Sequence, residues 1–191
     1  INVSQIPGSG DAGRVVKRDV EAFQGGGMVA TPGVERFTEV GIGQMRKTIA
    51  RRLADSKFSA PHFYLTVSID MDAAMDARKS INDAGEVKVS FNDMVVKAAA
   101  LALKKNPAVN SSWLEDRIRY NEHVHVGVAV SVEDGLLVPV VRHADGKRLS
   151  QIGAEVRDYA GKAREKKLQP SDWEGSTFTI SNLGMFGIDE F

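Results

Sequence analysis

The chain has 191 residues, of which 42% are hydrophobic and 26% are charged, and its formal net charge is zero. This composition is typical of globular domains, and the balanced charge gives no general attraction to nucleic acids or to anionic membranes. The absence of cysteine excludes disulfide bonds, thiol catalysis and cysteine-type zinc sites. No apolar run approaches the roughly 20 residues that span a membrane.

The N-terminal part differs in character from the rest of the chain. Residues 1–23 are rich in glycine and end in a pattern that predicts a short helix beginning near Asp19. This segment carries too little apolar surface to form a core of its own. Residues 24–39 include three consecutive glycines and a Pro-Gly pair, which predict a flexible linker to a main domain at residues 40–191.

Periodic apolar patterns divide the main domain into helices and strands. Apolar residues at intervals of three and four predict helices at residues 45–59, 72–83, 94–105 and 150–167. Alternation and short apolar runs predict strands at residues 63–71, 124–132, 136–141 and 177–181, and a hairpin at residues 113–120.

The order of these elements predicts the fold class. Helices and strands are interleaved, but Glu133-Asp134-Gly135 joins two strands as a tight turn, so these strands are expected to be antiparallel neighbours. We therefore predict an α/β (α+β) domain that has a mixed sheet with helices on one side, rather than a doubly wound parallel fold.

The closing run of residues 177–187 points to a hydroxyl that faces a ligand. β-branched and aromatic residues lead into Ser181, and glycines at positions 184 and 187 then turn the chain. Glycine permits close approach between backbone and ligand, so Ser181 fits a hydrogen-bond donor to a developing oxyanion. The G-x-S-x-G pattern of a nucleophilic serine is absent. A strand end that simply turns on Gly184 fits the same residues.

Arg78 and the histidines are the remaining candidates. Arg78 borders the apolar face of its predicted helix, where a guanidinium can reach a phosphate or can remain in solvent. His123 and His125 share one strand face but have no acidic or sulfur partner at ligand spacing. They are interpreted as partly exposed strand residues, and no metal site is predicted. His62 is interpreted as structural or solvent-facing.

Several segments together resemble the catalytic domain of the dihydrolipoamide acyltransferases, which are core subunits of 2-oxo-acid dehydrogenase complexes. The most specific are Asp-Gly-Leu-Leu-Val-Pro-Val, which begins at Asp134, and Thr-Ile-Ser-Asn-Leu-Gly, which ends at Gly184. Further matches lie at residues 44–53, 61–63 and 127–130. The Ser-Asn-Leu-Gly sequence resembles the acetyl-transferring branch of the pyruvate dehydrogenase complex. Succinyl-transferring relatives tend to have threonine in place of the serine, and branched-chain relatives keep the serine.

This resemblance implies a coenzyme A-dependent acyltransferase fold like that of chloramphenicol acetyltransferase, assembled as homotrimers that build a larger core. It also implies transfer of an acetyl group to coenzyme A from dihydrolipoamide, the lipoyl group being carried by a lipoyl domain that this chain does not include. By resemblance, Ser181 stabilises the tetrahedral oxyanion and Arg78 holds the 3′-phosphate of coenzyme A.

Residues 1–23 resemble the second half of a peripheral-subunit-binding domain. The implied partners are the pyruvate dehydrogenase and dihydrolipoamide dehydrogenase components, and Arg14, Lys17 and Arg18 would supply charge steering toward them. The implied compartment is the cytoplasm of a bacterium or the mitochondrial matrix.

One part of the family pattern is not found among these residues. The general base of the family lies in a His-Arg-x-x-x-Asp-Gly motif, and none of the four histidines stands in such a motif. We therefore expect a catalytic domain that is incomplete at the C-terminus, lacks its general-base histidine and is inactive by itself. Two alternatives stay open: a non-catalytic core or scaffold homologue that binds partner subunits, and a succinyl- or branched-chain acyltransferase of the same family.

Overall fold

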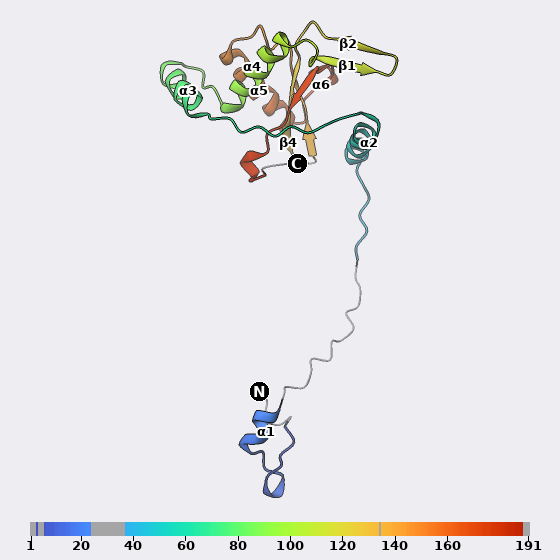
Figure 1. Ribbon diagram of the computed structural model, residues 1–191, viewed down its shortest axis with the longest axis vertical. Helices are drawn as coiled ribbons and strands as arrows, with labels where there is room; N and C mark the ends of the chain where they lie inside the picture. Colours follow the sequence, from blue (N-terminus) through green and yellow to red (C-terminus); the bar gives the residue numbers. More distant parts are fainter. Residues whose placement is uncertain (1–2, 4–5, 24–36, 134, 189–191) are drawn as a thin grey trace. The chain divides into compact units, whose positions relative to one another are not determined.

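The computed structural model describes residues 3, 6–23, 37–133 and 135–188 (Figure 1). The chain divides into two units, residues 1–41 and residues 42–191. Most of the predicted linker at residues 24–39 lies outside the described residues. Across the described ranges, no helix has both the length and the apolar character needed to cross a bilayer.

Asp19 organises the first unit, which contains the helix α1 (Lys17–Ala22) after a 3₁₀ turn, η2 (Asp11–Gly13). Its carboxylate accepts hydrogen bonds from the Ser9 N–H at 2.8 Å, the Ser9 hydroxyl at 2.5 Å and the Val16 N–H at 3.0 Å. These bonds, those from Ser9 foremost, lower the pKa of Asp19 to about 2. The helix begins two residues before its predicted start because Asp19 caps the first turn from inside the helix.

The helices of the second unit differ sharply in burial. They are α2 (Gln44–Ser59), α3 (Asp72–Ala84), α4 (Phe91–Lys105), α5 (Leu149–Arg164) and the short α6 (Pro170–Trp173). Neither α2 nor α3 has a buried residue, whereas α4 and α5 both contribute to the core.

A reciprocal cap starts α4, which begins three residues before the predicted start at residue 94. The Asp93 N–H donates to the Ser90 hydroxyl at 3.1 Å, and the Ser90 N–H donates to the Asp93 carboxylate at 2.7 Å. This satisfies two backbone donors that the first turn of a helix otherwise leaves unpaired. The helix ends at Lys105, just before Asn106 and Pro107, since proline cannot continue a helix.

The strands of the described residues form one mixed sheet and two hairpins. In the sheet, the central strand β3 (Val126–Val128) pairs antiparallel with β6 (Val140–Val141) and parallel with β7 (Phe178–Ile180). The hairpins join β1 (Ser111–Leu114) to β2 (Arg117–Tyr120) and β4 (Val130–Val132) to β5 (Gly135–Leu137). The predicted antiparallel pairing on either side of Glu133 is thus confirmed, and the sheet is mixed.

Two predicted strands are each divided in two. The strand expected at residues 124–132 is interrupted at Ala129, and the one expected at residues 136–141 is interrupted before β6. Pro139 lies in the second break, and it has no N–H to donate to a strand ladder. Its carbonyl still accepts the Val128 N–H at 2.9 Å, so the two segments stay together across the break.

The core lies where α4 and α5 meet the mixed sheet (Figure 1). Its members have at most a few per cent of their surface exposed and include Val96, Ala100, Val126, Val141 and Ile152. The two helices approach closely at Gly153, where a Cβ atom would stand 2.8 Å from the Asp93 carboxylate. A side chain at position 153 would therefore displace the Asp93 carboxylate that caps α4 or push the two helices apart.

Residues 63–71 do not form the predicted half-buried strand. The segment runs without regular secondary structure between α2 and α3, and Figure 1 shows it as a long teal line joining them. Phe63, Leu65, Val67 and Ile69, which form its apolar face, are between 71% and 80% exposed. The prediction was wrong because alternation identifies a face that favours burial and says nothing about what covers it.

Candidate active site

Ser181 follows a strand that is fixed at both of its ends. At the start of β7, the Thr177 N–H donates to the His125 carbonyl at 2.8 Å; at its end, the Ala129 N–H donates to the Ile180 carbonyl at 2.9 Å. Ser181 itself is half-buried. A hydroxyl on a residue that directly follows an anchored strand has its backbone position set by the sheet, which is what an oxyanion donor requires.

The turn after Ser181 has the glycine geometry that the sequence predicts. The Asn182 side chain accepts the Gly184 N–H at 3.1 Å, and a 3₁₀ turn, η3 (Gly184–Phe186), follows. Gly187 then adopts a left-handed conformation with φ of 70°, which strongly favours glycine. Gly187 therefore has a local reason to be glycine, and Ser181 remains a candidate on position alone.

The segment that leads into β7 is tied to the far side of the sheet. The Arg142 guanidinium, just beyond β6, donates to the carbonyls of Ser171 and Glu174, each at 3.0 Å. These bonds hold α6 and the turn after it, so the chain reaches Thr177 along a fixed path.

Arg78 is half-buried on α3, and its Nε atom is buried with no hydrogen-bond partner among the described residues. Buried donors in native proteins normally have partners, so this atom is an exception with a cost. The described residues therefore leave part of the hydrogen-bonding capacity of this guanidinium unused.

The histidines at positions 123, 125 and 143 gather at the start of β3. The His125 and His143 ring centres lie 4.5 Å apart, and the backbone N–H of His143 donates to Nδ1 of the His125 ring at 3.0 Å. Burial of the ring lowers the pKa of His125 below its usual value. His125 is 7% exposed and is therefore a buried residue, not the partly exposed strand residue that alternation predicts.

Because Nδ1 of His125 accepts a hydrogen bond, the proton of the neutral ring lies on Nε2. In the part of the chain that the structure describes, no group of histidine and acidic side chains is arranged to hold a metal ion.

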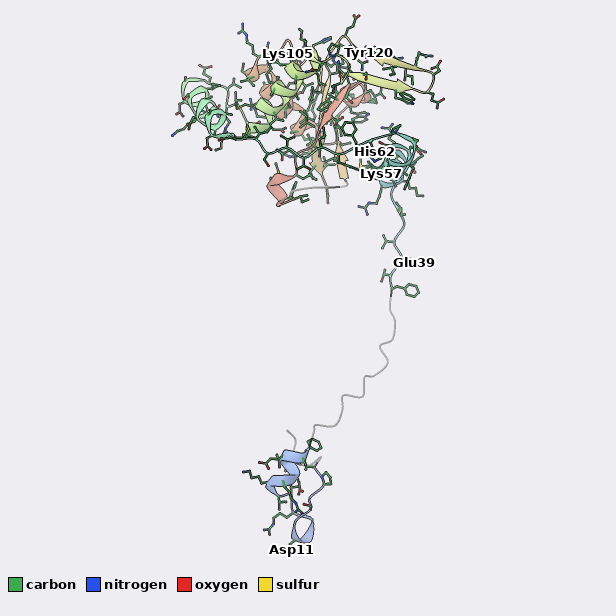
Figure 2. The ribbon with its side chains drawn as sticks, viewed as in Figure 1. Asp11, Glu39, Lys57, His62, Lys105 and Tyr120 are labelled. Carbon is green, nitrogen blue, oxygen red and sulfur yellow. The ribbon has the colours of Figure 1, made fainter. Side chains whose placement is uncertain are left out.

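His62 lies in an exposed chain of polar groups at the end of α2. Its Nδ1 bonds the Ala60 carbonyl at 2.9 Å and its Nε2 bonds the Tyr64 hydroxyl at 3.1 Å, while Lys57 also bonds that hydroxyl. Figure 2 labels Lys57 and His62 at this junction. All three side chains are exposed, in agreement with a solvent-facing His62.

The three basic residues expected to steer a partner lie in the first unit, and all are exposed. Lys17 forms an ion pair with Glu21 at 3.6 Å, and the Arg18 guanidinium donates to the Ser9 hydroxyl at 2.9 and 3.0 Å. Arg14 makes no ion pair or hydrogen bond through its side chain with the described residues, so its charge is the most available of the three.

An apolar cavity of about 330 Å³ lies between the end of α5 and the β4–β5 hairpin. Residues that line it include Met45, Val132, Leu137, Leu168 and Trp173. Neither Ser181 nor Arg78 lines this cavity, so it is separate from the residues with predicted chemistry.

Sequence reasoning missed three residues that support β7: Thr177, His125 and Gly127. Gly127 carried a usable signal, because a glycine inside an alternating strand often marks a close backbone approach. Thr177 and His125 carried none, since the bonds between them join positions 52 residues apart.

Comparison with known proteins places this arrangement in a family. Residues 34–191 match the family model described as 2-oxoacid dehydrogenases acyltransferase (catalytic domain). The chain is 46% identical over 207 residues to component 3 of the mitochondrial dihydrolipoyllysine-residue acetyltransferase of the Arabidopsis thaliana pyruvate dehydrogenase complex. It is 40% identical over 200 residues to the corresponding component from Rickettsia bellii. Both alignments cover 100% of this chain, but only 38% and 48% of the relatives.

Solved structures give the same result. One is an Azotobacter vinelandii dihydrolipoamide acetyltransferase, solved to investigate the roles of a serine, a histidine and an asparagine in its catalytic mechanism. It matches with a TM-score of 0.77 and 35% identity, over 82% of this chain and 66% of that one. A probable dihydrolipoamide acetyltransferase from Listeria monocytogenes matches with a TM-score of 0.76 and 33% identity, over 81% and 68% of the two chains. The α/β fold predicted from the sequence is therefore that of an acyltransferase catalytic core.

Proposed function

Because the chain belongs to the catalytic-domain family of the 2-oxoacid dehydrogenase acyltransferases, we propose that it is part of an acetyltransferase subunit in the core of a pyruvate dehydrogenase complex. The proposed reaction transfers an acetyl group from acetyl-dihydrolipoamide to coenzyme A. The 46% identity to the plant acetyltransferase component, over the whole of this chain, carries the proposal. Relatives from bacteria and from mitochondria fit a cytoplasmic or a mitochondrial matrix location.

The reaction exchanges one thioester for another. The coenzyme A sulfur forms a bond to the acetyl carbon, the carbonyl oxygen becomes an oxyanion, and the bond to the dihydrolipoyl sulfur then breaks. The proton of the coenzyme A thiol passes to a general base and from there to the departing thiolate. The transition state therefore needs a hydrogen-bond donor at the oxyanion and a base beside the thiol.

We assign the oxyanion donor to Ser181. Its position directly after β7, which is anchored on the buried strand β3, supports this role because a donor that is already fixed costs no reorganisation during the reaction. Ser181 is half-buried, so the residue is not enclosed in the core.

We assign the base to a histidine other than the four in this sequence. The ring of His125 is buried, and its Nδ1 is occupied by the His143 N–H. His62 lies in an exposed cluster at the end of α2. None of the four stands in the His-Arg-x-x-x-Asp-Gly motif of the family.

We assign Arg78 to the 3′-phosphate of coenzyme A. The buried Nε without a partner supports this role, because a bound phosphate oxygen would satisfy it. The guanidinium is planar and presents several donors, which suits a phosphate better than the single charge of a lysine would.

We further propose homotrimers that assemble into a larger core and carry the lipoyl group on a separate lipoyl domain. The exposed apolar face of residues 63–69 supports assembly, since apolar faces of this kind mark contact surfaces. The pyruvate dehydrogenase and dihydrolipoamide dehydrogenase components are the proposed partners of residues 1–23. Arg14 is the first residue of that segment to test, ahead of the partly engaged Lys17 and Arg18.

Removing the Ser181 hydroxyl tests the reaction. In the intact subunit that carries this sequence, Ser181→Ala should lower kcat by ~10²–10³ and leave KM for both substrates nearly unchanged, as for other oxyanion donors. Thr179→Val, which changes an exposed residue two positions earlier on the same strand, is the control. A loss below threefold for Ser181→Ala would mean that Ser181 only shapes the turn.

The role of Arg78 is tested with two forms of the substrate. Arg78→Ala should raise KM for coenzyme A and leave KM for dephospho-coenzyme A unchanged, because only the former carries the 3′-phosphate. Lys79→Ala removes the neighbouring exposed charge on α3 and should affect neither. Equal weakening toward both ligands would reject the phosphate contact.

The same measurements address the alternatives. An intact subunit that assembles and binds its partners without transferring an acetyl group would be a scaffold homologue. Faster turnover with succinyl or branched-chain acyl groups would place the subunit in another branch of the family.

A further inference from the structure

The beginning of the strand that leads to Ser181 is held by the Thr177 side chain and by two backbone N–H groups. The Thr177 hydroxyl accepts the His125 N–H at 3.2 Å and lies 3.3 Å from the His125 carbonyl, to which it donates. The Thr177 N–H and the Phe178 N–H also donate to this carbonyl, at 2.8 and 3.2 Å. One threonine hydroxyl thus bonds both polar backbone groups of His125.

Strand β3 carries no side chain at the middle of its pairing with β7. Gly127 is the middle residue of β3 and stands opposite Thr179 in the parallel ladder. A Cβ atom at Gly127 would lie 3.3 Å from the Thr179 hydroxyl oxygen, 3.4 Å from Cβ of Ser176 and only 2.8 Å from Val138 on the other side. A side chain at position 127 would therefore clash with the Val138 side chain and crowd the Thr179 hydroxyl.

We propose that Thr177 is a positioning residue for the Ser181 hydroxyl. The Thr177 hydroxyl holds the register of β7 on β3. Thr177 lies four positions before Ser181 and contacts neither substrate in this assignment. The inference rests on the proposed function, in which the Ser181 hydroxyl donates to the oxyanion of the acetyl transfer.

Two physical facts explain why the position of β7 should affect the rate of the reaction. Register matters because side chains alternate between the faces of a strand, so a slip of one residue would turn Ser181 to the opposite face. Distance matters because a misplacement of about 1 Å at a reacting centre can cost ~10²-fold in rate. The parallel ladder between β3 and β7 is only three residues long, so the side-chain bonds at its start are a large share of what holds it.

The test removes the Thr177 hydroxyl without changing its volume. In the intact subunit, Thr177→Val should lower kcat about tenfold with KM for both substrates within twofold, since the side chain positions a donor and binds no substrate. Thr177→Ser, which keeps the hydroxyl, should restore kcat to within about threefold of the parent.

Thr179→Val is the matched control, because it makes the same exchange on the same strand and the Thr179 hydroxyl has no hydrogen-bond partner among the described residues. It should keep parental kcat. Should valine at position 177 prevent folding, Thr177→Ala removes the same hydroxyl with a smaller side chain.

A double-mutant cycle shows whether Thr177 acts through Ser181. In a Ser181→Ala background, Thr177→Val should change kcat by less than about twofold, because the hydroxyl that it positions is already gone. A tenfold loss in both backgrounds would overturn the positioning role and leave Thr177 merely structural.

The cycle also separates this inference from the proposed function. A large effect of Ser181→Ala with parental kcat in Thr177→Val overturns the inference alone. A negligible effect of Ser181→Ala overturns both.

Discussion

Strand β3 and the segment of residues 63–71 stand at opposite extremes of the second unit. Val126 and Val128 in β3 are 0% and 3% exposed, whereas Leu65 and Val67 are 80% and 75% exposed. Both segments alternate apolar with small or polar residues. The difference between them lies in what surrounds them.

β3 has a neighbour on each edge and helices over it. β6 and β7 take up its backbone hydrogen bonds, and α4 packs against the strand. Among the described residues, the segment at 63–71 has no paired strand on either edge. An amphipathic strand is therefore stable only when other strands pair with its edges and other residues cover its apolar face. The assembly proposed above would supply these contacts to residues 63–71.

The contrast between the two regions is tested most directly by truncating one side chain in each of them. Ile152→Ala, at a position with no exposed surface, should lower the free energy of unfolding by about 2–5 kcal/mol, because it leaves a cavity in the core. Leu65→Ala should change it by less than ~0.5 kcal/mol. Urea denaturation of the 191-residue chain measures both. A loss of several kcal/mol for Leu65→Ala would show that the segment is packed in solution.

Two glycines of α5 allow the same contrast between a packed and an open position to be tested on one helix. Gly153→Ala should destabilise the chain by about 1–3 kcal/mol, because the new methyl group would stand 2.8 Å from the buried Asp93 carboxylate. Gly161→Ala should instead stabilise it by about 0.5–1 kcal/mol, because its methyl group meets nothing within 4 Å and alanine favours a helix. Thermal melts of the two variants should shift in opposite directions, and shifts of the same sign would contradict the close approach at Gly153.

The smallest effect is expected in the first unit, where order depends on a carboxylate instead of a core. The folded pKa of Asp19, about 2, is below its ordinary value of 3.8, so its stabilisation is present above pH 3.8 and is lost as the pH falls toward 2. The amide resonances of Ser9 and Val16, whose N–H groups bond this carboxylate, should move in that window. In Asp19→Asn the same resonances should no longer titrate there.

Local chemistry made parts of the fold predictable. The reciprocal cap of Ser90 and Asp93 starts α4, and the turn at Glu133 joins an antiparallel pair, because each involves residues only a few positions apart. The break near Pro139 was also readable in principle, since proline cannot donate to a ladder. The fate of residues 63–71 was not, because it depends on surfaces outside the segment.

The residues of the candidate site also differ in whether local sequence could identify them. Ser181 and Arg78 were singled out through sequence patterns and a family resemblance, and their roles stay predictions that the kinetic variants test. Burial of His125 and the bonds of Thr177 to it could not be read from the sequence, because they depend on which distant strand lies beside β3.

The parallel pairing of β3 with β7 also constrains how the chain acquires its structure. The bonded residues His125 and Thr177 are 52 positions apart, and the whole of α5 lies between them. During synthesis on a ribosome, one edge of β3 must wait for the later strand to emerge, and a contact of this range closes slowly because the intervening loop loses entropy. Nascent chains halted before residue 177 should therefore depend on chaperones that shield an apolar strand, and chains extended past residue 181 should be released from them.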